Sequence, residues 1–342
     1  MKITLTKISE MTGISCSTIS RVLTGNGYVK PETREIVEAA LAEHGYKYKP
    51  SKKKVASAFK KVVLVICGDI TNNVYTGYIA GINSIFERQG IKTLIANSDY
   101  STESEEEFLS FASCSGFAGV IMLNAVETPS LLRILQTIKC PIVFINRYLK
   151  SINVDIVSMD TYRGGYLATD YLIRNGHRNI AHLCGPDNST SVQNKENGYS
   201  DAMKNAGLDP NKCTSYRGDL HYKSGYLFGK QLLRTNDPAT AVFSDNATMA
   251  SGLIDAYYDS GKEIPKDLSI LCADELPDTI TGKVELTTVS CDFKKLGSVA
   301  AKRMIDIINT GDTARQSIIF PPVLTVRDSV AKFTNKNNGS VK

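Results

Sequence analysis

The sequence of 342 residues has no tryptophan, only four histidines and no apolar run long enough to cross a bilayer. A membrane-spanning helix needs about 20 consecutive apolar residues, so no segment of that kind is expected. The N-terminus, MKITLTKISE, also lacks the apolar core and the small-residue cleavage site of a secretory signal. These absences predict a protein that stays in the cytoplasm.

Two further absences argue against broad classes of function. No CxxC pair occurs among the eight cysteines and the histidines show no ligand spacing, which argues against disulfides and zinc. The dinucleotide, phosphate-loop, nucleophile-elbow and HExxH motifs of common enzymes are also missing. Arg147 and Asp69 are conceivable catalytic groups, but nothing at matched spacing supports them. We expect no metal, no cofactor and no enzymatic activity.

Positive charge is concentrated at one end of the chain. Residues 1–61 contain 12 Lys and Arg against 5 Asp and Glu, a net charge of +7, whereas the remainder has 28 against 30. A basic module attached to a nearly neutral body is typical of nucleic-acid binding. A solvated basic tail would give the same charge, but this segment also has helical patterning.

Residues 1–45 predict three short helices. Thr4 or Thr6 can cap a first helix that ends near Thr12, and Gly13 supplies a sharp turn because glycine tolerates positive φ. Ser15 or Cys16 opens the second helix, and residues 31–44 form the third, with a proline at its first turn. A helical unit of this size has too small a core to be stable without a partner.

A different pattern begins at residue 62. Short β-branched runs alternate with helical patterns, such as residues 78–90 and 103–116, in two successive series, which predicts parallel sheets covered by helices on both faces. The expected strands are 62–67, 92–97, 118–123, 141–146 and 156–160 in the first series, and 180–185, 213–218, 240–246 and 268–274 in the second. The fold class is therefore α/β, with two doubly wound lobes after a helical head. In open sheets of this kind, ligands bind beyond the carboxyl ends of the strands, where Asp69, Asn146, Asn246 and Asp274 stand.

Several stretches carry a resemblance to a known family. TKISEMTGISCSTISRVL, from residue 6, resembles the N-terminal helix-turn-helix of the lactose/galactose repressor family of bacterial transcription regulators. The body is similar to that family over 160–186, 245–274, 286–297 and 321–329, so the resemblance covers nearly the whole chain. It implies a DNA-binding domain (1–46), a hinge (47–61), a two-lobed body resembling periplasmic sugar-binding proteins (62–334) and a disordered tail (335–342). The implied N-lobe is about 62–160 with 292–321, and the C-lobe about 161–291 with 322–334.

The resemblance also implies which residues contact DNA. The second helix of such a motif enters the major groove, and Cys16, Ser17 and Arg21 match the family's base-reading positions. Arginine can make a bidentate contact to guanine, whereas serine discriminates less. The remaining expected contacts are to phosphates and flanking backbone, from Thr4, Ser15, Thr18, Ser20, Asn26, Lys52, Lys53 and Lys54.

The hinge departs from the family pattern. Where family members carry a leucine that wedges into the minor groove, this chain has Ser57, with Phe59 two residues later. Either Phe59 takes the role of the leucine, or the seven lysines of the 46–61 stretch bind DNA by charge alone; the second is slightly favoured. From its composition the segment is either a flexible tether or an element that becomes ordered on DNA.

The resemblance further implies an effector cleft between the lobes. Tyr75, Asn146, Lys195, Asn246 and Asp274 match cleft positions, and Asp69, Arg147 and Leu220 are expected beside them. Three positions depart from the family pattern: Lys195 stands where the family usually has an arginine, Leu220 where many members have an aromatic residue, and Ala247 where an aspartate is usual. A free sugar is the first expectation, and a sugar phosphate or another anion would use Lys195.

The implied function is a DNA-binding transcriptional regulator, expected to act as a repressor of a carbohydrate-utilisation operon. Two heads that read the half-sites of a palindromic operator must be related by a twofold axis, so a homodimer is expected. A tetramer is not expected, because the polar C-terminal tail has no helical heptad segment. A sugar-like effector would change the spacing of the heads allosterically. The competing hypothesis, a periplasmic binding protein, would share the lobes but not the basic head.

Overall fold

The computed structural model describes residues 5–24, 29–43, 59–235, 239–274, 282–312 and 314–334. The chain divides into a small helical unit within the first 60 residues and a larger α/β unit that holds almost everything from Lys61 onward. Residues 47–58 of the predicted hinge and the predicted tail lie outside the described residues.

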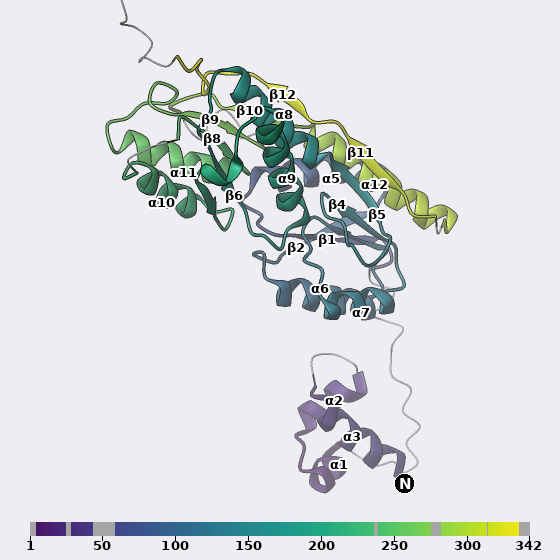
Figure 1. Cartoon of the computed structure of the whole chain (residues 1–342). Helices are drawn as coiled ribbons and strands as arrows, with labels where there is room; N and C mark the ends of the chain where they lie inside the picture. Colours follow the sequence, from purple (N-terminus) through teal and green to yellow (C-terminus); the bar gives the residue numbers. More distant parts are fainter. Residues whose placement is uncertain are drawn as a thin grey trace, which may run out of the picture. The chain divides into compact units, whose positions relative to one another are not determined.

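The described residues of the small unit form three helices, α1 (Leu5–Thr12), α2 (Cys16–Thr24) and α3 (Pro31–Glu43) (Figure 1). Ile8, Ile19, Val22 and Leu41 form most of its core, each at most 2% exposed. Gly13 ends α1 with φ +68, and its N–H donates to the carbonyl of Ser9, so the predicted glycine turn is confirmed.

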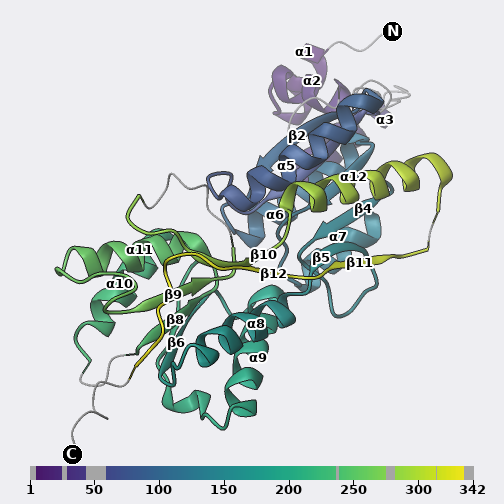
Figure 2. The ribbon, with the colours of Figure 1, turned by 90° about the horizontal axis from the view of Figure 1, so that it is seen from above.

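The first lobe of the α/β unit is built on one sheet, in the order β11-β5-β4-β3-β1-β2 (Figures 1 and 2). All of its pairings are parallel. The strands are β1 (Val62–Cys67), β2 (Lys92–Asn97), β3 (Gly119–Met122), β4 (Ile142–Ile145), β5 (Asp155–Met159) and β11 (Ser317–Phe320). The helices are α5 (Asn73–Phe86), the 3₁₀ turn η1 (Glu87–Gln89), α6 (Thr102–Ser115), α7 (Pro129–Thr137) and α12 (Phe293–Thr310).

The second lobe repeats this design around a sheet in the order β12-β10-β9-β8-β6-β7. Its pairings are parallel except for β10 with β12. The strands are β6 (Ile180–Cys184), β7 (Ser215–Arg217), β8 (Ala241–Ser244), β9 (Ser269–Cys272), β10 (Thr287–Ser290) and β12 (Val323–Thr325). The helices are α8 (Thr161–Arg174), α9 (Thr190–Asn205), the 3₁₀ turn η2 (Pro210–Lys212), α10 (Tyr222–Leu232) and α11 (Ala247–Tyr258).

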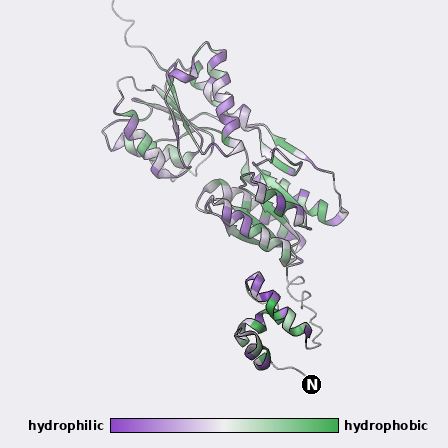
Figure 3. Ribbon diagram, turned by 60° about the horizontal axis from the view of Figure 1, so that its bottom comes forward, coloured by the Kyte–Doolittle hydropathy of each residue, from purple (hydrophilic) through white to green (hydrophobic). Residues whose placement is uncertain are grey.

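Alternate residues of one strand point to opposite faces of a sheet, and both faces are covered here. In β8, Val242 packs in the cluster of α10 and α11, whereas Ala241 and Phe243 pack in the cluster of α8 and α9. Hydrophobic and hydrophilic stretches alternate along the helices, as expected where one side of each helix faces a sheet (Figure 3). The near-continuous apolar composition of the central strands follows from this double burial.

Pairs of helices in the α/β unit lie side by side and approach closely at glycines (Figures 1 and 2). A Cβ added to Gly165 of α8 would lie 2.2 Å from the carbonyl oxygen of Lys195 in α9, and one on Gly198 would lie 2.1 Å from that of Tyr162. The α10–α11 and α5–α12 pairs meet through glycines in the same way. Since these contacts are to backbone, the glycines set the position of α9 and with it that of Lys195.

The chain passes between the two sheets three times: after β5, after β10 and after β11. The lobes are thus joined by three short connections rather than by one linker. Strand ends from both lobes converge near these connections, which is where the candidate site lies.

Two sequence predictions about this unit needed correction. The strand at 92–97 was expected between covering helices, but β2 is an edge strand and four of its six residues are exposed. The first helix was placed from Tyr78, but α5 begins at Asn73, where the Asn72 side chain caps it by accepting from the N–H of Val74. No described helix is long and apolar enough to cross a membrane.

Candidate functional site

The first candidate site is the outer face of α2 in the small unit. Ser15, Cys16, Ser17 and Arg21 are exposed, while Ile19 and Val22 of the same helix are fully buried. The polar face therefore has room for a partner, and the apolar face only holds the helix in place. Thr18 and Ser20 are half-buried at the edge of this face.

Ser15 organises the start of α2. Its Oγ accepts a hydrogen bond from the N–H of Thr18 and lies 3.0 Å from the Oγ of Ser17 and 2.9 Å from the Oγ1 of Thr18. This is the N-cap that the sequence predicted, and it ties three of the predicted phosphate and base contacts into one local network. The other predicted DNA contacts, Thr4, Asn26 and Lys52–Lys54, lie outside the described residues.

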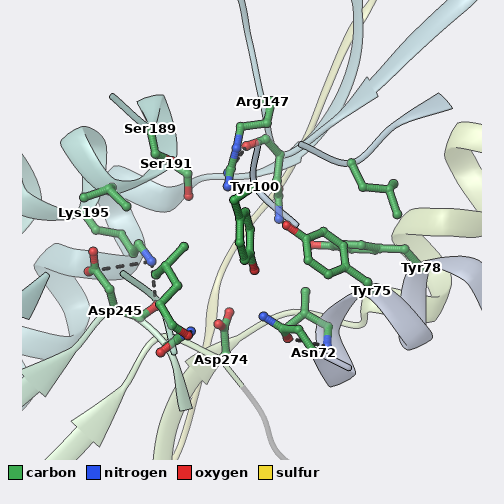
Figure 4. Close-up of a pocket in the computed structure, with 16 residues that line it drawn as sticks. Asn72, Tyr75, Tyr78, Tyr100, Arg147, Ser189, Ser191, Lys195, Asp245 and Asp274 are labelled. Carbon is green, nitrogen blue, oxygen red and sulfur yellow. Dashed lines mark hydrogen bonds and ion pairs between the residues drawn. The ribbon is translucent and has the colours of Figure 1, made fainter. Parts of the chain in front are cut away.

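The second candidate site is a pocket in the α/β unit, lined from both lobes (Figure 4). The pocket is partly open to solvent. Tyr75 and Tyr78 of α5 face Ser191 and Lys195 of α9 across it. Its lining consists of Asn72, Val74, Tyr75, Tyr78, Tyr100, Leu123, Asn146, Arg147, Ser189, Ser191, Val192, Lys195, Leu220, Asp245, Asn246 and Asp274.

Seven of the eight residues proposed from the sequence for an effector line this one pocket. They are Tyr75, Asn146, Arg147, Lys195, Leu220, Asn246 and Asp274. The eighth, Asp69, does not line it. Its carboxylate accepts from the N–H and the hydroxyl of Thr71 and so shapes the loop after β1. A polar residue at a strand end can serve a turn as readily as a ligand.

Unusual backbone conformations gather at this pocket. Among the described residues, four that are not glycine have positive φ, and three of them line it: Tyr100 (φ 57), Asn146 (φ 53) and Leu220 (φ 70). Such conformations cost free energy for side chains larger than glycine, and they cluster at functional sites. The surrounding hydrogen bonds hold them in place.

Asn146 and Asn246 illustrate how these bonds work. Oδ1 of Asn146 accepts from the N–H of Met159 and the hydroxyl of Ser158 across two strands, and its amide donates to Tyr78. Oδ1 of Asn246 caps α11 by accepting from the N–H of Met249, and its amide donates to the carbonyl of Leu220. Both asparagines therefore shape the pocket wall as well as line it.

A buried charge network lies behind the second-lobe wall. The ammonium group of Lys195 donates to the carbonyl oxygen of Asp245 at 2.7 Å and lies 3.6 Å from its carboxylate. The other partners of that carboxylate are Nε2 of His182 at 3.1 Å and the N–H of Gly185 at 2.9 Å. The His182 ring is stacked between Tyr199 and Phe243.

The charges in this network stabilise one another. Burial favours the neutral form of Asp245, but Lys195 and His182 outweigh it and hold the pKa of the carboxyl below its usual range. Burial likewise disfavours the imidazolium of His182, but the charge of Asp245 raises the pKa of that ring to about 9. The network is thus a buried carboxylate between two cations, which fixes the Lys195 side chain at the pocket.

Asp274 differs because nearby cations only partly offset the cost of burying its carboxylate. Burial raises the pKa of its carboxyl to about 7; Lys195 and Arg147 oppose this, and the nearby Asp245 adds to it. The group titrates near neutral pH and can either donate or accept a hydrogen bond to a ligand hydroxyl.

The chain is similar to known bacterial proteins along nearly its whole length. Residues 4–50 match the family described as "Bacterial regulatory proteins, lacI family", and residues 169–330 match the periplasmic binding protein-like domain. The HTH-type transcriptional regulator DegA of Bacillus subtilis (strain 168) is 29% identical over 335 residues, which are 97% of this chain and 99% of DegA. The chain therefore joins a lacI-family DNA-binding domain to a periplasmic binding protein-like domain.

Other lacI-family proteins give the same result. The HTH-type transcriptional repressor PurR of Pasteurella multocida (strain Pm70) is 29% identical over 332 residues, 96% of this chain and 98% of PurR. A solved LacI family transcriptional regulator from Enterococcus faecium with bound ribose is 28% identical with a TM-score of 0.71, and the match covers 80% of this chain and 100% of that chain. This lacI-family chain is a DNA-binding transcriptional regulator, and the predictions of family, fold and regulatory role are confirmed.

Sequence reasoning missed several residues that line the pocket of this lacI-family protein. Tyr78 was assigned only to a helix, and Tyr100 lies in a loop after the edge strand, where no periodic signal exists. Ser189 and Ser191 lie at the start of α9, a position that an N-cap search could have flagged. Asp245 directly precedes Asn246 after β8, so the strand-end argument could have included it.

The pocket and its surroundings offer no metal centre. No group of three or more potential metal ligands occurs among the described residues. All eight cysteines are free, and four of them (67, 184, 272 and 291) are buried. The relatives named above are transcriptional regulators rather than enzymes.

Proposed function

We propose that this regulator represses genes for carbohydrate utilisation by binding a palindromic operator as a homodimer, and that a sugar-like effector in the pocket controls it. One observation carries the proposal: a single pocket draws polar side chains from both lobes of a unit attached to a DNA-binding head. A ligand that contacts both lobes favours the arrangement in which they are closed, and so has differential affinity for two states.

At the operator, α2 would enter the major groove. Arg21 would read a guanine, Cys16 and Ser17 would contact other base edges, and Ser15 and Thr18 would hold phosphates. Support comes from the exposure of Ser15, Cys16, Ser17 and Arg21 on one polar face. Phosphate contacts set the register, and base contacts supply the sequence preference.

A dimer would supply the second head. Support comes from β2, an edge strand whose Leu94 and Ile95 are 42% and 37% exposed. Exposed apolar edge strands invite pairing with another chain, and a twofold partner satisfies that edge on both copies at once. Two heads related by a twofold axis would read two half-sites of a palindrome.

The effector would lie among Tyr75, Asn146, Lys195, Asn246 and Asp274. Carboxyl and amide groups suit a polyhydroxylated ligand, and buried tyrosines give it an apolar wall. The ribose bound to the Enterococcus faecium regulator, which resembles this chain, makes a small sugar the first compound class to test.

A thermal-shift screen of sugars on the full chain tests the proposal, followed by DNA-binding measurements with the compounds that stabilise it. We expect at least one sugar-like compound to raise the melting temperature and to change operator affinity. Asp274→Asn should weaken that stabilisation, while the exposed Asp187→Asn should leave it unchanged. If sugars and sugar derivatives all fail to stabilise the protein, the effector proposal is wrong.

A further inference from the structure

Arg147 is a buried cation in the pocket wall that has only neutral hydrogen-bond acceptors. Its side chain is 9% exposed; Nε donates to the amide oxygen of Asn124 at 3.3 Å, and one terminal nitrogen donates to the carbonyl of Asn146 at 2.9 Å. Within the described part of the chain, no carboxylate lies within 4 Å of its guanidinium. A buried guanidinium in this state gains from a negative partner.

The start of α9 presents hydrogen-bonding groups that have no partner among the described residues. Ser189 is 6% exposed and lines the pocket, yet its Oγ accepts and donates no hydrogen bond within that part of the chain, and neither does the buried Oγ1 of the neighbouring Thr190. Ser189 is the N-cap residue of this 16-residue helix, but its side chain does not cap it. The first N–H groups of a helix have no partner within the helix, and they carry partial positive charge.

These groups gather at one end of the pocket. Figure 4 shows Arg147, Ser189 and Ser191 together, with Asp274 and Asn72 toward the opposite end. A cation, hydroxyls and a helix N-terminus make up one end, while a carboxyl and an amide make up the other. The pocket is therefore polarised along its length.

The ammonium group of Lys195 is already held by the carbonyl and the carboxylate of Asp245, so it is less available to a ligand than the guanidinium of Arg147. Its network with His182 adds positive charge to the pocket wall. Asn124 lies between Arg147 and Glu105, because its amide oxygen accepts from Arg147 and its amide nitrogen donates to Glu105. Burial raises the pKa of Glu105, and its Oε2 has no hydrogen-bond partner among the described residues. The guanidinium hydrogen-bonds only to amide and carbonyl oxygens there, so it can still pair with an anion.

We propose that the effector is a polyhydroxylated small molecule with a terminal oxyanion, a phosphate or a carboxylate. The oxyanion lies between the guanidinium of Arg147, the hydroxyls of Ser189 and Ser191 and the N-terminus of α9. Asp274 and Asn72 hold hydroxyls at the other end. Arginine binds tetrahedral and planar oxyanions through a fixed fork of donors, and a helix N-terminus favours the same charge. This inference rests on the proposed function, since it names the chemical class of that effector.

Matched pairs of ligands test the inference on the full chain. Thermal shift and calorimetric titration would compare ribose with ribose 5-phosphate, glucose with glucose 6-phosphate and with gluconate, and inorganic phosphate alone. We expect one anionic member to bind at least tenfold more tightly than its parent sugar, and the phosphate and gluconate arms to tell the two oxyanions apart. Inorganic phosphate should bind weakly, because it lacks the hydroxyls.

Two variants separate recognition from folding. Ser189→Ala removes a buried hydroxyl that has no partner among the described residues, so the free protein should be equally or more stable. The same change should lower the affinity for the anionic ligand at least threefold. Arg147→Gln should lower the preference for the anion over its parent sugar at least tenfold, and the exposed Asp187→Asn serves as the control.

Parent sugars that bind as tightly as their anions would overturn the inference and leave the proposed sugar-like effector standing. If neither sugars nor their anions bind, the proposed effector class fails together with the inference. A preference for the anion that survives both variants would also overturn it, since the oxyanion would then lie elsewhere.

Discussion

Replacing Asp274 with asparagine should stabilise the free protein, and the gain should be larger at alkaline than at acid pH. The carboxyl has a pKa of about 7 in the folded chain against an ordinary value of 3.8, mainly because it is buried. Between those values the folded state holds a proton that the unfolded state releases. The stability of the wild type therefore falls as the pH rises through this window. The asparagine variant has no such proton to lose.

The size of the effect follows from the pKa difference. Each unit of difference corresponds to about 1.4 kcal/mol, and from pH 5 to pH 8 most of the difference is crossed. Allowing for partial exposure of the carboxyl, we expect the wild type to lose about 2 kcal/mol through this group. For a unit of this size that corresponds to a fall in melting temperature of about 4 °C or more.

The assay is thermal denaturation of the wild type and Asp274→Asn at pH 5 and pH 8, without ligand. The variant should already melt slightly higher than the wild type at pH 5, because the unfolded wild type is ionised there, and the gap should widen by several degrees at pH 8. Asp187→Asn, at an exposed carboxylate, controls for the change in net charge. Equal melting temperatures of variant and wild type at both pH values would refute the reasoning, because the carboxyl would then be ionised without cost.

Two further predictions concern the hinge and the helix packing. Changing Lys52–Lys54 to Gln should flatten the dependence of DNA affinity on salt by about 0.9 in slope per lost phosphate contact, which a titration at several salt concentrations measures; an unchanged slope would exclude these lysines. Gly165→Ala should destabilise the folded protein by about 2 kcal/mol or more, measured by urea denaturation, because the added Cβ would lie 2.2 Å from the Lys195 carbonyl oxygen. Gly164→Ala on the same helix is the control: its Cβ would have no neighbour closer than 3.7 Å, so it should be neutral or slightly stabilising. Similar losses at both glycines would contradict the close-packing argument.

Much of the fold was predictable because its signals are local. The strands at 62–67 and 92–97 were placed with their observed bounds, since β-branched runs between turn residues are a strong pattern. The exposure of β2 was not predictable, because whether a strand is central or at an edge depends on which strands pair across long sequence distances. The capped start of α5 at Asn73 was missed because the preceding residues also suit a loop.

The pocket was predictable only in part, and the reason is the origin of each residue. Strand ends converge by the rules of parallel sheets, so Asn146, Asn246 and Asp274 could be brought together from the sequence. Ser189 and Tyr100 come from a helix start and a loop, whose positions depend on tertiary packing. The hydrogen bond between His182 and Asp245 links two adjacent strands through their side chains. Neither the residue types nor their spacing in the sequence predicts this contact.

We propose that the chain recognises a specific operator through α2 and that a ligand in the pocket raises or lowers its affinity for that operator. The most direct measurement is selection of bound sequences from a random DNA library by the full-length protein, repeated with Arg21→Ala. We expect the wild type to enrich a palindromic sequence. The variant should lose about 1–3 kcal/mol of binding free energy, and its preference at one base pair of each half-site should be relaxed. Enrichment without twofold symmetry, or a variant that weakens all sequences equally, would contradict it.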